Sequence, residues 1–142
     1  MRGLSLTLML LSIVLAGCSR EIPVTGDEQK SVLAYAEPVT DSLLKGFNDG
    51  DYALYARDFD EAMKNALPEK VFRQTREMIL GKIGTYKSRV LDRVFKKDQY
   101  TVVLYKAAFE KEEGVSVKVV FVKFGEKNLV SGLWFNSPRL RQ

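Results

Sequence analysis

Residues 115–124, Val-Ser-Val-Lys-Val-Val-Phe-Val-Lys-Phe, decide the fold class of this chain. Apolar side chains alternate with Ser116 and Lys118 in the first part of the stretch, a period of two that is typical of a β-strand with one buried face. The many β-branched valines also favour a strand over a helix. The residues predicted to face the core are Val115, Val117, Val119 and Phe121.

Three more runs rich in Val, Phe and Tyr accompany this strand, at residues 86–95, 99–110 and 129–135. Short polar segments connect the four runs. Because a parallel crossover needs a dozen or more residues, links this short join antiparallel neighbours. The second half of the chain is therefore predicted to be a four-stranded antiparallel meander.

Before Gly84 the apolar residues recur every three or four positions, which predicts three helices. The first helix follows Thr25 and Glu28, which have the spacing of a capping box, and it should be kinked or split at Pro38. Gly50 is suited to end this helix in the left-handed conformation.

The second helix is predicted over residues 52–67 with a break at Asp58, and the third from Pro68 onward. A lone sheet must bury one face, and the helices supply the apolar surface that covers it. The predicted fold class is α+β, with three N-terminal helices packed on a curved four-stranded antiparallel sheet. This single domain covers residues 27–137, and residues 138–142 form a C-terminal tail.

The first 17 residues have the form of a targeting segment. Arg2 precedes an apolar stretch at residues 4–15, which is shorter than the ~20 residues of a membrane-spanning helix. The stretch ends in Leu15-Ala16-Gly17-Cys18, which resembles the lipobox of bacterial lipoproteins. The resemblance implies cleavage between Gly17 and Cys18, followed by attachment of diacylglycerol and palmitate-type acyl chains to the cysteine.

On this interpretation residues 1–17 are a lipoprotein signal peptide, and residues 18–26 are the lipidated cysteine and a short tether. We expect an exported protein that is anchored to a membrane through Cys18. Ser19 in place of Asp implies the outer membrane, facing the periplasm, in a Gram-negative cell. In any other cell the protein would lie on the outer face of the cell membrane.

The chain has no histidine, and Cys18 is its only cysteine. These absences exclude Ser-His-Asp and Cys-His catalysis, His-ligated zinc and a disulfide within the chain. An EF-hand starting at Asp49 would have Leu54 where glycine is required and Asp60 where glutamate is required. We therefore expect no metal and no cofactor.

The isoelectric point near 9.2 and the net charge of +4 raise the question of an anionic partner. Lys and Arg are interleaved with Asp and Glu along the chain, as on a solvated surface, so no nucleic-acid partner is expected. We interpret Lys96, Lys97 and the tail at residues 138–142 as a solubilising turn and a frayed terminus rather than as lipid contacts.

Several short motifs resemble an uncharacterised domain family that occurs in exported lipoproteins and sometimes precedes an α/β-hydrolase domain. That family is similar to the nuclear-transport-factor-two-like, or cystatin-like, superfold, in which a curved antiparallel sheet wraps around helices. The resemblance covers residues 30 to 136 and implies a cone with a pocket between sheet and helices. The motifs are Gly46-Phe47-Asn48-Asp49-Gly50-Asp51-Tyr52, Asp58-Phe59, Phe72, Leu80-Gly81-Lys82-Ile83-Gly84-Thr85-Tyr86-Lys87-Ser88 and Gly132-Leu133-Trp134-Phe135.

Enzymes of the resembled superfold place an Asp with a His or Tyr in this pocket, and here only Asp and Tyr are present. A buried Asp with a raised pKa would be a general base. The alternative is that Asp51 and Asp58 cap helix starts and the tyrosines pack on the core. The candidate catalytic residues are Asp41, Asp51 and Asp58 with Tyr52, Tyr55, Tyr86 or Tyr105. The residues predicted to line a pocket are Tyr52, Tyr55, Phe59, Tyr86, Tyr105 and Trp134.

We predict a membrane-tethered, non-catalytic domain that binds a small apolar ligand or an envelope protein partner. A rival hypothesis is a small enzyme of isomerase or dehydratase type that uses a pocket Asp and Tyr. A third is an accessory subunit of a separate hydrolase or transporter. A perturbed Asp in a pocket favours the enzyme, whereas an exposed apolar patch favours a partner.

Overall fold

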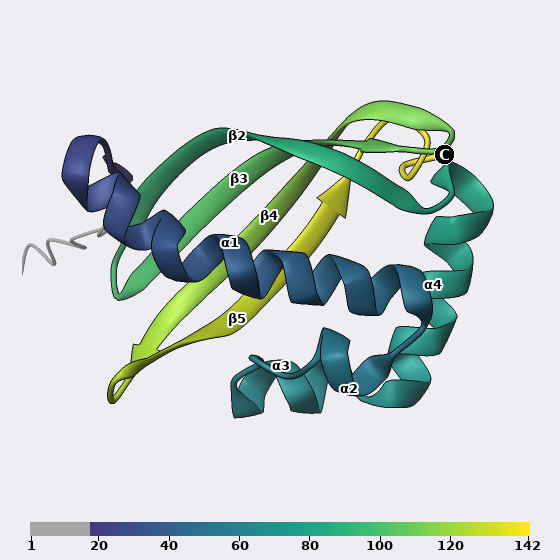
Figure 1. Ribbon diagram of the computed structural model, residues 1–142, viewed down its shortest axis with the longest axis horizontal. Helices are drawn as coiled ribbons and strands as arrows, with labels where there is room; N and C mark the ends of the chain where they lie inside the picture. Colours follow the sequence, from purple (N-terminus) through teal and green to yellow (C-terminus); the bar gives the residue numbers. More distant parts are fainter. Residues whose placement is uncertain (1–17) are drawn as a thin grey trace, which may run out of the picture.

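A computed structural model describes residues 18–142, and the predicted signal peptide, including Gly17, lies outside these residues. Residues 18–142 form four helices and a five-stranded antiparallel sheet (Figure 1). The elements are β1 (Ile22–Pro23), α1 (Gly26–Asp49), α2 (Tyr52–Tyr55), α3 (Glu61–Ala66), α4 (Glu69–Ile83), β2 (Tyr86–Lys97), β3 (Tyr100–Phe109), β4 (Glu112–Phe124) and β5 (Lys127–Asn136).

The sheet has the strand order β1-β2-β3-β4-β5, and every neighbouring pair is antiparallel. The predicted meander of β2 to β5 is therefore confirmed. In Figure 1 the sheet is curved and α1 crosses its concave face, with α2 and α3 beside β5 and α4 at the far end. The fold class is α+β, as predicted, with one helix and one strand more than the sequence suggested.

The extra strand, β1, lies inside the segment predicted to be a tether. Ile22 pairs with Lys96 and Pro23 pairs with Phe95 on β2. Val24 continues the contact, because its N–H donates to the carbonyl oxygen of Val94 at 2.9 Å and its side chain is buried. A two-residue strand that contains proline has no periodicity, so no sequence pattern could reveal it.

Helix α1 is one element of 24 residues, and Pro38 does not split it. Proline removes only one backbone donor, and buried residues on both sides of Pro38 hold the two halves of the helix against the sheet. The predicted capping box is absent: Thr25 is the N-cap residue but makes no side-chain cap hydrogen bond, and Glu28 pairs with Lys96. Gly50 does end the helix in the left-handed conformation, with φ 69°.

The predicted helix over residues 52–67 is divided into α2 and α3, with its break around Asp58 as expected. Asp60, and not Asp58, caps α3 by accepting a hydrogen bond from the N–H of Met63 at 2.8 Å. Asp58 contacts β5 through its backbone: its carbonyl oxygen accepts a hydrogen bond from the N–H of Val130 at 2.7 Å. The break exists where the chain leaves the helix to pair with the edge of β5.

The predicted core face of β4 is confirmed. Its four side chains are at most 1% exposed and pack beneath α1, which buries Leu43, Leu44 and Phe47 on the same core. Burial of each such side chain contributes about 1.5–3 kcal/mol. The four residues are Val115, Val117, Val119 and Phe121.

The C-terminal tail is attached to the domain, in contrast to the prediction of a frayed terminus. Leu140 packs against the core, and the ammonium group of Lys82 on α4 donates to the carbonyl oxygen of Gln142 at 2.7 Å. The packed domain therefore extends beyond the predicted limits of residues 27–137, from Val24 to Leu140.

Gly46 lies at the tightest contact between α1 and α2. A Cβ atom at this position would stand 2.4 Å from the backbone nitrogen of Tyr55, so only glycine allows this approach. Gly81, in the last turn of α4, has no atom within 4 Å of the corresponding position. Packing therefore requires glycine at position 46, whereas position 81 has room for a side chain.

We predict that Gly46→Ala lowers the free energy of unfolding by about 2 kcal/mol or more, because α1 and α2 must separate to admit a methyl group. Gly81→Ala is the matched control and should raise it by about 0.5–1 kcal/mol, because it restores helix propensity in open space. Urea denaturation followed by circular dichroism measures both values. Equal effects of the two substitutions would contradict the proposed packing.

Candidate functional site

A cleft of about 450 Å³ opens between the first half of α1 and the concave face of the sheet, and we name it the α1–sheet cleft. It lies at the end of the molecule where the β2–β3 and β4–β5 turns meet the start of α1 (Figure 1). The residues that line it are Glu28, Ser31, Val32, Tyr35, Lys96, Asp98, Gln99, Tyr100, Thr101, Phe121, Lys123 and Asn128.

The cleft has an apolar floor and a polar rim. Val32 and Phe121 are buried at the floor, and the ring of Tyr35 packs edge-on against that of Phe121 with centroids 5.3 Å apart. At the rim Lys96 forms an ion pair with Glu28. Burial raises the pKa of Tyr35 above its ordinary value, so its hydroxyl stays protonated and can donate a hydrogen bond. This combination is typical of sites for small ligands.

An ionic group centred on the buried side chain of Arg89, the Arg89 cluster, ties the middle of α1 to β2 and β3. It consists of Glu37, Asp41, Tyr86, Arg89 and Tyr105. The guanidinium of Arg89 donates to the carboxylates of Glu37 at 2.6 Å and Asp41 at 2.7 Å, and to the hydroxyl of Tyr86 at 3.1 Å. The Tyr105 hydroxyl donates to the second oxygen of Glu37 at 2.8 Å, and the guanidinium carbon lies 4.9 Å from the Tyr105 ring centroid.

The electrostatics of the Arg89 cluster favour fixed protonation states. Burial by itself would lower the pKa of Arg89, but the hydrogen bonds to Asp41 and Tyr86 and the charge of Glu37 raise it above its ordinary value. Burial raises the pKa of Tyr105, and the Glu37 carboxylate raises it further. Neither pKa is moved toward neutrality, where a general acid or base works best.

The three candidate catalytic aspartates do not converge. Asp41 is bound to Arg89, whereas Asp51 caps α2 by accepting from the N–H of Leu54 at 3.0 Å. Asp58 forms an ion pair with its neighbour Arg57 at 2.9 Å. Only Asp41 shares a cluster with predicted tyrosines.

The aromatic residues predicted to line one pocket are divided among several places. Tyr52, Tyr55 and Phe59 form an aromatic cluster with Phe72 of α4, with ring centroids 4.4 to 5.6 Å apart. Burial raises the pKa of Tyr55, with a smaller contribution from Tyr52. The Tyr52 hydroxyl donates to the carbonyl oxygen of Leu67 at 2.8 Å. These rings fill the space between α2 and α4.

Tyr86 and Tyr105 lie beneath α1 in the Arg89 cluster, and Trp134 lies on the opposite side of the sheet. Trp134 pairs with Lys118 across β4 and β5, and the Lys118 ammonium nitrogen is 4.1 Å from the Trp134 ring centroid. None of the six residues predicted to line a pocket lines the α1–sheet cleft. Sequence reasoning could not group them, because the groups join elements that are distant in the chain.

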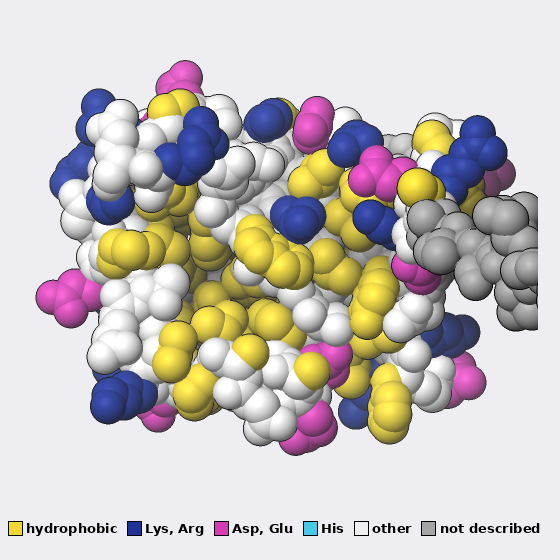
Figure 2. All heavy atoms as spheres, turned by 180° about the vertical axis from the view of Figure 1, so that it is seen from behind, with side chains coloured by type: hydrophobic (Ala, Val, Ile, Leu, Met, Phe, Trp, Pro, Cys, Tyr) yellow, Lys and Arg dark blue, Asp and Glu magenta, His cyan; other side chains and the backbone are white. Residues whose placement is uncertain are grey.

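The convex side of the sheet, which we name the outer face, is a second candidate surface that the sequence analysis missed. Figure 2 shows this side with apolar side chains spread across its middle. It contains a groove of about 350 Å³, lined by Glu21, Phe95, Lys97, Tyr100, Val102, Lys118, Val120, Ser131 and Trp134. The available signal was that Val120, Val122 and Phe124 occupy outward positions of β4 where polar residues were expected.

Cys18 is exposed and lies four positions before Ile22, the first residue of β1. No helix within residues 18–142 is long and apolar enough to cross a membrane. Over the same residues, no group of three or more Cys, Asp or Glu side chains has the arrangement of a metal site.

Residues 41–133 match a family that is described as a protein of unknown function, DUF3887. The chain belongs to this family. The match agrees with the predicted resemblance to an uncharacterised domain family. No curated protein matches the chain.

The DUF3887 match runs from Asp41, in the middle of α1, to Leu133 in β5. It includes Asp41, Tyr86, Arg89 and Tyr105 of the Arg89 cluster. The family match does not extend to the first half of α1, which forms one wall of the α1–sheet cleft, or to β1. The cleft of this DUF3887 chain is therefore built partly from residues outside the matched region.

For the Arg89 cluster we predict that Arg89→Met lowers the free energy of unfolding by about 1–3 kcal/mol. Glu37, Asp41 and Tyr86 all lose the donor that the largely buried guanidinium supplies. Arg73→Met, which removes an exposed pair with Glu69 on α4, is the matched control and should cost about 0.5 kcal/mol or less. Chemical denaturation of both variants measures the difference. A loss no larger for Arg89 than for Arg73 would show that the cluster is not a structural tie.

Proposed function

We propose that this DUF3887 chain is a lipid-anchored, non-catalytic binding domain that works on the outward side of a membrane. The observation that carries the binding proposal is the α1–sheet cleft, with its apolar floor and polar rim. Its volume of about 450 Å³ lies within the range of small-molecule sites.

The ligand we propose for the cleft is small and largely apolar, with a polar or anionic end. Val32 and Phe121 would contact the apolar part, while Lys123 and the Tyr35 hydroxyl stand where they would bind the polar end. If the sheet and α1 form the cone of the nuclear-transport-factor-two-like superfold, this cleft lies where that superfold has its pocket. An envelope protein partner is the alternative occupant.

The anchor proposal rests on the lipobox-like sequence that ends at Cys18 and on the position of this cysteine. Three residues separate Cys18 from Ile22, the first residue of β1, so the two are at most about 14 Å apart. Two acyl chains on Cys18 would hold the domain against the bilayer, because each buried methylene contributes about 0.8 kcal/mol. In a Gram-negative cell this membrane would be the outer membrane, and otherwise the outer face of the cell membrane.

The absence of catalysis is proposed from the roles of the groups that a catalyst would need. Asp41, Asp51 and Asp58 each have a partner in an ion pair or a helix cap. The pKa values of Tyr55 and Tyr105 are raised by burial, which makes their hydroxyls poorer acids. These observations favour a binding domain over the isomerase or dehydratase hypothesis.

For the anchor we predict that Cys18→Ser abolishes labelling with radioactive palmitate and leaves an uncleaved precursor or a soluble product. Ser19→Ala is the matched control and should be labelled and retained by membranes as the parent is. Labelling of cells that express the full chain, followed by fractionation, gives the result. Normal labelling and membrane retention of Cys18→Ser would refute the lipoprotein assignment.

For the cleft we predict that anilinonaphthalene sulfonate, an apolar dye with an anionic group, binds to the mature protein with increased fluorescence. Ser31→Phe, which places a ring in the cleft, should weaken this binding by about tenfold or more. Ala34→Phe changes another exposed position on α1 and is the matched control. Equal dye affinity of the two variants would mean that the α1–sheet cleft is not the site.

For catalysis we predict no turnover of ester, peptide, glycosidic or phosphate substrates by the mature protein. Replacing Asp41, Asp51 or Asp58 singly by Asn should leave the cellular phenotype largely intact where the fold is preserved. Turnover that disappears on one such replacement, in a variant as stable as the parent, would exclude a pure binding domain and establish the enzyme.

A further inference from the structure

The outer face of the sheet carries more basic than acidic side chains. Its outward positions are every second residue of each strand, on the side of the sheet that holds Val102, Lys118 and Trp134. Within β2 to β5 these positions contain several basic side chains. The acids beside them are Asp92, the extra residue of a bulge in β2, and Glu21, which pairs with Arg93. The basic residues are Arg93, Lys97, Lys106, Lys118 and Lys127.

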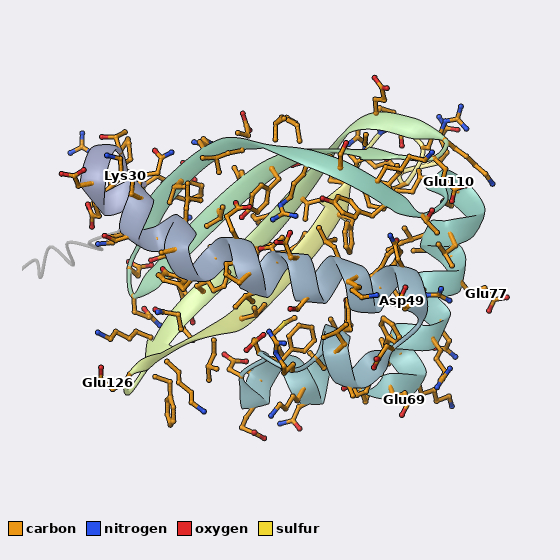
Figure 3. All side chains as sticks on the ribbon, viewed as in Figure 1. Lys30, Asp49, Glu69, Glu77, Glu110 and Glu126 are labelled. Carbon is orange, nitrogen blue, oxygen red and sulfur yellow. The ribbon has the colours of Figure 1, made fainter. Side chains whose placement is uncertain are left out.

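The acidic side chains lie mostly elsewhere. Figure 3 shows Glu69 and Glu77 on α4, and Glu110 and Glu126 at turns near the ends of the sheet. Glu110 is bound to Thr85 at the start of β2. The outer face is therefore more positive than the rest of the domain, and the even mixture of charges along the sequence hides this difference.

The outer face is also unusually apolar for a surface without a covering element. Val90, Phe124 and Trp134 are 66%, 75% and 51% exposed, and all three lie at outward positions of the sheet. The helices of the described chain pack on the opposite, concave side (Figures 1 and 2). Large exposed apolar areas that are bordered by charge mark a site of interaction with a protein or a membrane.

The anchored end of the chain leaves the domain beside this face. Glu21 lines the outer groove, and its carboxylate accepts a hydrogen bond from the guanidinium of Arg93 at 3.2 Å. Cys18 is three residues earlier and therefore within about 10 Å of the groove. A lipid on Cys18 would enter a bilayer next to the outer face.

We propose that the outer face of the sheet docks onto the anionic surface of the membrane that holds Cys18. This inference rests on the anchor of the proposed function and adds the orientation of the domain on the bilayer. The basic side chains match anionic headgroups, and Trp134 has the amphipathic ring that favours the membrane interface. An acyl anchor and a basic surface together form the two signals of a stable membrane attachment.

A second copy of the chain fits this face less well than a membrane does. Two outer faces packed together would bring Lys97, Lys106 and Lys118 of one copy toward the same lysines of the other, and like charges repel at an interface. Docking through the outer face also leaves the α1–sheet cleft open, because the cleft lies on the other side of the sheet.

Trp134 is the only tryptophan of the chain, so its fluorescence reports on this face alone. The mature protein, purified from membranes in its lipidated form, is reconstituted into vesicles of phosphatidylcholine with or without phosphatidylglycerol. The lipids carry bromine on their acyl chains, and the quenching of Trp134 is measured. Mass spectrometry of the same sample determines whether Cys18 is lipidated, which tests the anchor separately.

We expect strong quenching in the anionic vesicles and weaker quenching in vesicles of phosphatidylcholine alone. The double substitution Lys97→Glu with Lys106→Glu should remove the difference in quenching between anionic and neutral vesicles. Each basic residue near an anionic surface favours the docked state by about fivefold. Lys64→Glu with Lys70→Glu changes the net charge equally on α3 and α4 and should leave the quenching unchanged. Circular dichroism verifies that both double variants are folded.

Quenching that does not depend on anionic lipid, or that falls equally in both double variants, would overturn the docking proposal. Crosslinking of two copies through the outer face in these vesicles would also overturn it and assign the face to a dimer. A lipidated protein without Trp134 quenching means that the anchor is right and the orientation wrong. A protein without lipid on Cys18 refutes the anchor, and with it the docking proposal.

Discussion

The packing of α1 across the concave face of the sheet is the contact on which the rest of the structure depends. A four-stranded meander has no stable form in water until one face is covered, and α1 covers the valine row of β4 with Leu43, Leu44 and Phe47. The Arg89 cluster adds directional bonds to this apolar contact, since Arg89 reaches Glu37 and Asp41 from β2. The apolar surface supplies the free energy, while the ion pairs fix the position of the helix.

This arrangement gives the two faces of the sheet different properties. The concave face is buried under α1 except at one end, where the helix and the strands diverge and leave the α1–sheet cleft. No helix within residues 18–142 covers the outer face, and its apolar and basic side chains are exposed to solvent in this part of the chain. A ligand site on one side and a membrane-facing surface on the other can therefore coexist in a small domain.

Both edges of the β2–β5 meander are partly covered by other segments of the chain. Ile22 and Pro23 pair with β2, and Phe59 forms a bridge to Val130 on β5, so neither outer strand leaves its full edge open for pairing with another chain. The same β1 segment also fixes where the chain from Cys18 reaches the domain. Protection of the edge and orientation of the anchor are thus consequences of one short strand.

The sequence by itself determined the α+β class, the meander of β2 to β5, the buried face of β4, the C-cap at Gly50 and the break near Asp58. These features depend on local periodicity and turn chemistry, which neighbouring residues decide. Only the tertiary structure decided that β1 pairs with β2, that Pro38 stays inside one helix and that Arg89 joins Asp41 to Tyr105. It also separated Trp134 from the other aromatic residues of the predicted pocket and brought Lys97, Lys106, Lys118 and Lys127 to the outer face. Each of these features depends on contacts between residues far apart in the chain, whose free energy appears only when the helix and the sheet have come together.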